Sequence, residues 1–315
     1  MWEVLKKTKD GFFDHKVLKM SASLAYTTVF SMAPMLLVIL FICDLFFGRA
    51  AIEGAIYFQI KNLVGANGAD LVQTMIKNLS ISNKSSVAGI VGIMMLLIGA
   101  TSVFAEIQDS INTIWGIRPK KHSGFWMYLK SRLLSFGVIG SLGFILLVSL
   151  GLSIIVDSLS TRLFSEFSNV AFYVIYGINL AVTFLIITVL FGSIFTILPD
   201  AEINWKQVRI SSITTAILFM IGKFLITYYI AKSNINSLYG TAGSLVVLMV
   251  WVYYSSVILY LGAEFAKAYA LHYSKSIIPS EFAEIIHTVE LTSEEKNLQN
   301  SEKELDELKK SPKIN

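Results

Sequence analysis

The sequence predicts an all-α, polytopic membrane protein with six transmembrane helices, an extracytoplasmic amphipathic helical hairpin and a cytoplasmic tail. Hydrophobic residues make up 54% of the chain and charged residues only 15%, and the mean hydropathy is +0.63. A water-soluble domain could not easily place so much apolar surface. The apolar segments are continuous and do not alternate with polar residues, which indicates membrane-spanning helices and not a barrel.

The first element, residues 1–20, is expected to be an amphipathic helix on the inner leaflet. Its apolar side chains recur at roughly helical spacing among lysines, a pattern typical of interfacial helices. It does not resemble a signal peptide, because acidic and basic residues are mixed and no small-residue cleavage site follows the next apolar segment. We therefore expect the first span to remain in the mature protein.

Six apolar segments are long enough to cross a bilayer, since about 20 residues span roughly 30 Å of hydrocarbon. They are residues 21–43, 85–105, 133–156, 167–199, 210–231 and 233–263. Lys223, in the fifth, is the single charged residue within them. These segments predict a transmembrane domain over residues 21–275.

Two further segments lie outside the spans. Residues 50–84 are expected to form the hairpin, with amphipathic arms on both sides of a turn at 65–68. This hairpin either caps the bundle or has a lipid-facing or substrate-gating role. Residues 276–315 are polar and are interpreted as a solvated, partly helical cytoplasmic tail, with a coiled-coil partner site as the alternative.

Basic residues between the spans set the orientation. The short loops that hold most of them are on the same side as both termini, which predicts cytoplasmic N- and C-termini. This bias accounts for the net charge of +4 without a nucleic-acid partner. Cys43 is the single cysteine, so the chain has no internal disulfide and no thiolate metal cluster.

Several ordered motifs together resemble a known family. They are Ser23-Leu24-Ala25-Tyr26, Ser31-Met32-Ala33-Pro34, Ile111-Asn112-Thr113-Ile114-Trp115, Leu198-Pro199-Asp200 with Trp205, Gly222-Lys223, Tyr239-Gly240-Thr241-Ala242-Gly243-Ser244, Trp251-Val252-Tyr253-Tyr254 and Leu261-Gly262-Ala263-Glu264. From about residue 10 to 275 the chain is similar to the YihY/virulence factor BrkB family of bacterial inner-membrane proteins. The resemblance implies six transmembrane helices and a bacterial plasma-membrane location. The activity of the family is not established, although members have often carried the label ribonuclease BN.

The ribonuclease label has no chemical support in the sequence. RNA hydrolysis needs a metal cluster or an acid–base pair in an aqueous basic cleft. The histidines are scattered along the chain, and no metal-ligand spacing such as H-E-x-x-H occurs. We therefore expect a protein that is not an enzyme and that needs no cofactor or metal.

Polar residues within the apolar segments suggest where a ligand would bind. Lys223 is costly in a span, and such residues usually face the bundle and mark a pathway. It is expected either to be satisfied structurally, by carbonyls that Pro34 frees on the first span, or to bind an anion or a lipid headgroup. The candidate site comprises Lys223, Pro34, Ser31, Tyr26, Tyr254 and Trp251, and the family-motif residues are Asn112, Trp115, Pro199, Tyr239, Gly240, Gly243, Gly262 and Glu264.

Two classes of function fit these features. The first is a transporter-like or lipid-handling permease, in which a seam between spans one, five and six receives an anionic or amphipathic substrate. The second is a non-transporting membrane scaffold that recruits partners through its tail and hairpin. The expected partners are the bilayer, an anionic lipid or amphipathic small molecule, a second copy of the chain, or a cytoplasmic protein at the tail.

Overall fold

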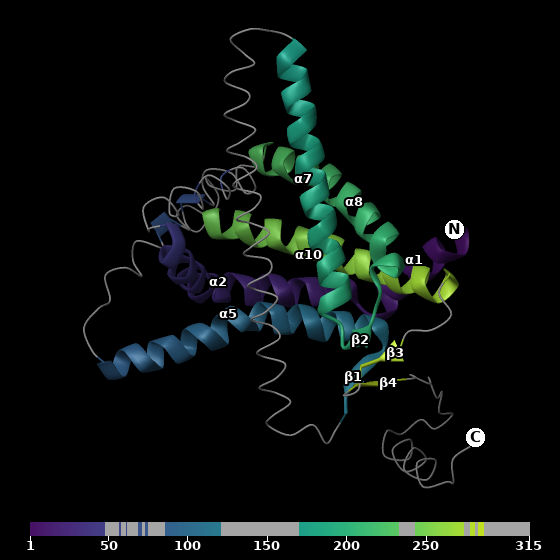
Figure 1. Cartoon of the computed structure of the whole chain (residues 1–315), viewed down its shortest axis with the longest axis horizontal. Helices are drawn as coiled ribbons and strands as arrows, with labels where there is room; N and C mark the ends of the chain where they lie inside the picture. Colours follow the sequence, from purple (N-terminus) through teal and green to yellow (C-terminus); the bar gives the residue numbers. More distant parts are fainter. Residues whose placement is uncertain are drawn as a thin grey trace. The chain divides into compact units, whose positions relative to one another are not determined.

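The computed structural model describes residues 1–47, 57, 61, 69–70, 73–74, 86–120, 170–232, 243–273, 278–280 and 283–286. Most of these residues are helical, as the sequence predicts (Figure 1). The helices are α1 (Trp2–Asp14), α2 (Val17–Phe47), α5 (Ser86–Trp115), α7 (Val170–Ile197), α8 (Trp205–Lys232) and α10 (Gly243–Tyr273).

Five of the predicted spans coincide with these long helices: α2, α5, α7, α8 and α10 cover the first, second, fourth, fifth and sixth. Among the described residues, three segments are long and apolar enough to cross a membrane, namely Gly177–Ile197, Trp205–Tyr229 and Leu245–Tyr273. The third predicted span, residues 133–156, lies outside the described residues. The number of six spans and the cytoplasmic location of both termini therefore stay predictions.

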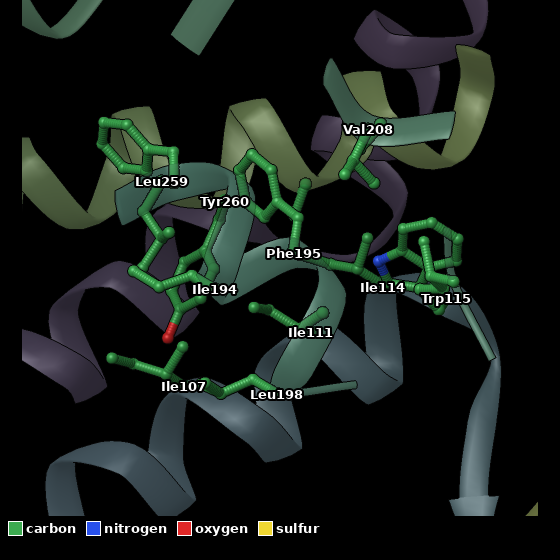
Figure 2. Packing of buried hydrophobic residues seen from close by; sticks show 14 of the residues in the cluster. Ile107, Ile111, Ile114, Trp115, Ile194, Phe195, Leu198, Val208, Leu259 and Tyr260 are labelled. Atoms are coloured by element: carbon green, nitrogen blue, oxygen red, sulfur yellow. The ribbon is translucent and has the colours of Figure 1, made fainter. Parts of the chain in front are cut away.

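The helix α10 packs between two other helices of the bundle. It contacts α2 along one side and α8 along another, while α5 lies against α2 and α7 lies against α8 (Figure 1). A core of buried side chains joins α5, α7, α8 and α10 (Figure 2). Its largest fully buried side chains are Tyr260 of α10, Phe195 of α7, and Ile111 and Ile114 of α5.

Two small antiparallel sheets lie beside the helices, and the all-helical prediction misses them. Strand β1 (Ile117–Pro119) pairs with β4 (Ala283–Ile285) in one sheet. Strand β2 (Ala201–Glu202) pairs with β3 (Ile278–Pro279) in the other. These pairs bring the first residues of the predicted tail back to the chain that follows α5 and α7.

The chain divides into a compact unit, Met1–Ile285, and a second unit, Ile286–Asn315. Residues 287–315 lie outside the described part of the chain, so the helical content of the tail and its role as a partner site stay predictions. The same holds for most of the predicted hairpin at 50–84. Within it, the Tyr57 hydroxyl donates a hydrogen bond to Asp70 Oδ1 at 3.1 Å, and this bond raises the pKa of Tyr57.

Candidate functional site

The contact between α8 and α10 is very close at Gly222. The aromatic ring and hydroxyl of Tyr254 occupy the space that a Cβ atom at Gly222 would fill. The Tyr254 hydroxyl also donates a long hydrogen bond, 3.4 Å, to the carbonyl of Leu218. Small residues at membrane helix interfaces allow this kind of approach. The sequence therefore needs glycine at 222 so that Tyr254 can lie across α8.

The same interface continues along both helices. A Cβ atom at Gly262 would meet the side chains of Thr215 and Phe195. Trp251, one helical turn before Tyr254, packs edge-on against Phe219 with ring centroids 6.0 Å apart. The predicted site residues Tyr254 and Trp251 thus lie together on α10, facing α8. Their position identifies them as packing residues at this interface.

Lys223 directly follows the glycine at this interface. It is half-buried within the apolar segment Trp205–Tyr229. In the described part of the chain, no acidic side chain lies within ion-pair distance of its amine. Large apolar and aromatic neighbours on α8 are exposed, among them Phe224 at 58% and Tyr228 at 67%. Lys223 thus stands at the boundary between the helix contact and an exposed apolar surface of α8.

The residues proposed on the first span lie on α2, and α10 separates them from α8. Ser31 is buried, whereas Tyr26 is 58% exposed and contacts the exposed ring of Phe30 in a tilted arrangement with centroids 4.5 Å apart. Pro34 is within α2, but its side chain lies outside the described residues. Few residues of α2 and α8 come near each other. Among the described residues, the structure therefore does not bring Lys223 together with the α2 residues of the predicted site.

Asn112 holds the turn between α7 and α8 against α5. Its amide nitrogen donates to Asp200 Oδ2 at 2.7 Å, and its side-chain oxygen accepts from the Asp200 backbone N–H at 2.9 Å. Gln108, one turn earlier, donates to Asp200 Oδ1 at 3.0 Å. Asn112 is 3% exposed, so these bonds satisfy polar groups that would otherwise be buried without partners. Asn112 therefore has a structural role, since it links α5 to the turn between α7 and α8.

Glu264 forms a second polar link, between α10 and the N-terminal segment. Its side chain is 2% exposed, and Oε1 lies 2.6 Å from His15 Nδ1. The other carboxylate oxygen packs directly against Gly11 of α1, where a Cβ atom would collide with it. A buried carboxylate needs such a partner because desolvation of an unpaired charge is costly. This pair fixes α1 to the end of the sixth predicted span.

The other motif residues contribute to packing or lie outside the described part. Trp115 and Pro199 are buried, and Trp115 packs beside Ile114 and Val208 in the core (Figure 2). Gly243 is buried and begins α10. Tyr239 and Gly240 lie outside the described residues. The motifs thus locate helix contacts and connections, and they do not converge on one catalytic arrangement among the described residues.

Comparison with known proteins identifies the family of this chain. The sequence profile of the family described as virulence factor BrkB matches residues 8–282, which is most of the chain. The chain belongs to this family. As a BrkB-family member it is a membrane protein, as are its relatives, and no solved structure matches it.

Curated relatives carry only a general name. A UPF0761 membrane protein of Ralstonia nicotianae is 27% identical over 257 residues, which cover 79% of this chain and 54% of that protein. One of Psychromonas ingrahamii is 27% identical, with 76% and 78% covered. One of Haemophilus influenzae is 24% identical, with 81% and 91% covered. The chain thus spans about half the length of the Ralstonia protein and most of the other two.

Sequence reasoning missed two of the polar links. His15 is one of the histidines that are scattered along the sequence, yet it pairs with Glu264, 249 positions away. The sequence presents Asp200 only as part of a motif, whereas in the structure it accepts bonds from two amide side chains of α5. The contact between Asn112 and Asp200 could have been predicted, because both residues belong to motifs at the same predicted membrane boundary.

Proposed function

We propose that this BrkB-family protein is a permease that handles an anionic amphipathic molecule, with Lys223 as the contact for its negatively charged head. The observation that supports this proposal is the half-buried position of Lys223 in the apolar part of α8 without an acidic partner among the described residues. A lysine in the centre of a span costs about 2.5 to 3.5 kcal/mol on the insertion scale. An anionic ligand would offset that cost.

The surface around Lys223 suits a lipid-like ligand. Phe224 and Leu225 are exposed at 58% and 66%, and Tyr228 and Tyr229, about one turn further on, are exposed at 67% and 57%. Exposed apolar rings and aliphatic chains can pack along acyl chains, and tyrosine hydroxyls can donate to phosphate oxygens. The headgroup would lie at Lys223 while the tails follow the outer surface of α8.

The depth of Lys223 argues against simple extension to the water. It precedes Lys232, the last residue of α8, by nine positions, which corresponds to roughly 13 Å along a helix. A lysine side chain can reach the interface from near a helix end, but this distance stretches it fully. Lys232 differs, because it is exposed and its amine lies 5.9 Å from the centre of the Tyr228 ring.

Native mass spectrometry of the purified protein tests the proposal. The wild type would be compared with Lys223→Met and with the matched control Lys232→Met, a change on the same helix at the membrane boundary. We expect the wild type and Lys232→Met to retain anionic phospholipid through purification, and Lys223→Met to lose it. Lys223→Arg should retain it, because the charge is kept.

The opposite outcome has a clear meaning. If all these proteins retain the same anionic lipids in the same amounts, Lys223 does not bind a headgroup. Lys223 would then be a structural residue, and the non-transporting scaffold would become the better account of the protein.

A further inference from the structure

The helix α1 presents three distinct faces to its surroundings. Val4 and Thr8 are buried, and with Gly11 and His15 they form a stripe at helical spacing that packs on α10. At 3.6 residues per turn, a second face carries side chains that are apolar or basic and exposed; they are Trp2, Leu5, Lys6, Lys9 and Phe13. The third face is exposed and mainly acidic, with Glu3, Asp10 and Asp14 beside a single lysine, Lys7.

The exposure of the second face is unusual for such large apolar groups. Trp2 is 80% exposed, Phe13 is 63% exposed and Leu5 is 49% exposed. Between them stand Lys6 and Lys9, which are also exposed. We call this set the apolar–basic face. Exposed tryptophan, phenylalanine and leucine side chains accompanied by lysines are typical of helices that lie in a membrane interface.

The orientation of α1 is fixed by a polar bond and a turn at one end and by an apolar cluster at the other. His15 at its end bonds to the buried carboxylate of Glu264 on α10. Lys16, the link to α2, adopts a left-handed backbone with φ of 54°, which turns the chain sharply between the two helices. A small cluster of Val4, Phe265 and Ala268 holds the other end. The apolar–basic face therefore cannot rotate toward the core.

The level of α1 along the bundle coincides with the membrane surface. The apolar segment of α10 runs over Leu245–Tyr273, which is 29 residues, whereas about 20 residues cross the hydrocarbon. The residues of α10 beyond those needed to cross the hydrocarbon lie at the end that holds Glu264 and His272. Both residues contact the N-terminal segment: Glu264 pairs with His15, and His272 lies 3.7 Å from Glu3 of α1. Charged groups in this last part of α10 indicate the headgroup region, so α1 lies at headgroup depth.

We infer that the apolar–basic face of α1 is a docking surface for the anionic lipid headgroups of the leaflet nearest the N-terminus. Trp2, Leu5 and Phe13 enter the boundary between headgroups and acyl chains, while Lys6 and Lys9 contact the phosphates. The acidic face points to water, because anionic lipid would repel it. This inference is independent of the role proposed for Lys223, which lies on a different helix, within the apolar segment Trp205–Tyr229 of α8.

Spin-label accessibility in the full-length protein tests this inference. In a Cys43→Ser background, nitroxides would be attached at Phe13→Cys on the apolar–basic face and at Asp10→Cys on the acidic face. The protein would be placed in nanodiscs of phosphatidylcholine with or without phosphatidylglycerol. Collision with oxygen, which is lipid-soluble, would be compared with collision with a water-soluble nickel chelate. Both positions are exposed, so labelling should leave the fold intact.

With phosphatidylglycerol present, we expect the oxygen-to-nickel ratio to be several-fold higher at position 13 than at position 10. This contrast should shrink in phosphatidylcholine alone and in a variant with Lys6→Glu and Lys9→Glu. Equal ratios at the two positions would overturn the inference, as would a contrast that does not depend on lipid charge. Protection of position 13 from both reagents would show that another macromolecule, and not lipid, covers the face.

Discussion

The pair formed by His15 and Glu264 gives the sharpest stability prediction. Glu264 is 2% exposed and accepts a bond from His15 at 2.6 Å. Removing His15 leaves the buried carboxylate without this hydrogen bond, and hydrogen bonds to charged groups contribute about 1.5 to 3 kcal/mol. His15 is itself 26% exposed, so water can enter after its removal. We therefore expect His15→Ala to lower the free energy of unfolding by about 2 to 3 kcal/mol.

A double-mutant cycle isolates the interaction. Glu264→Ala removes the buried carboxylate, so adding His15→Ala to it should cost little more. The expected coupling energy is about 2 kcal/mol. Unfolding would be followed in mixed micelles by titration with a denaturing detergent, at a pH where the reference protein is folded. If the free-energy changes of the two single mutants add up to that of the double mutant within about 0.5 kcal/mol, the two residues are independent and the reasoning is refuted.

Three further predictions concern packing, topology and activity. Gly222→Val should displace Tyr254 and destabilise the protein by about 1 to 3 kcal/mol. Gly177→Val is the matched control, because no neighbouring atom among the described residues lies within 4 Å of a new Cβ there, and it should change the midpoint of the same detergent titration very little. A cysteine at Lys61 should react with an impermeant probe in intact cells and one at Lys296 only after permeabilisation; labelling of the tail in intact cells would contradict the topology. Purified protein should show no RNA cleavage that a point mutation in this chain abolishes, as measured with a labelled tRNA substrate.

The long helices could be predicted from the sequence because their signal is local. The length and composition of each apolar segment can be read directly from the sequence. In lipid, such a segment must be helical so that its backbone N–H and C=O groups are hydrogen-bonded. The structure accordingly places helices over five of the six predicted spans. The short strands gave no such signal. Pairs such as Ile117 with Ile285 depend on partners distant in sequence, in strands of only two or three residues.

The candidate site could be predicted only in part. A lysine in an apolar segment is visible in any sequence, and Lys223 is indeed half-buried in α8. Its surroundings could not be predicted, because they depend on which helices pack together. The sequence grouped spans one, five and six in one seam, whereas α10 stands between α2 and α8 among the described residues. The exposure of Phe224 and Tyr228 around the lysine emerged only from the packing.

Lipid movement in proteoliposomes tests the central claim most directly. Vesicles containing the protein and a fluorescent phosphatidylglycerol would be treated with dithionite, which destroys the dye in the outer leaflet. If the protein handles anionic lipid at Lys223, the wild type and Lys232→Met should expose more dye than the outer-leaflet share found in protein-free vesicles, and Lys223→Met should not. Dye loss by the wild type that matches protein-free vesicles, or loss that persists unchanged in Lys223→Met, would contradict the account.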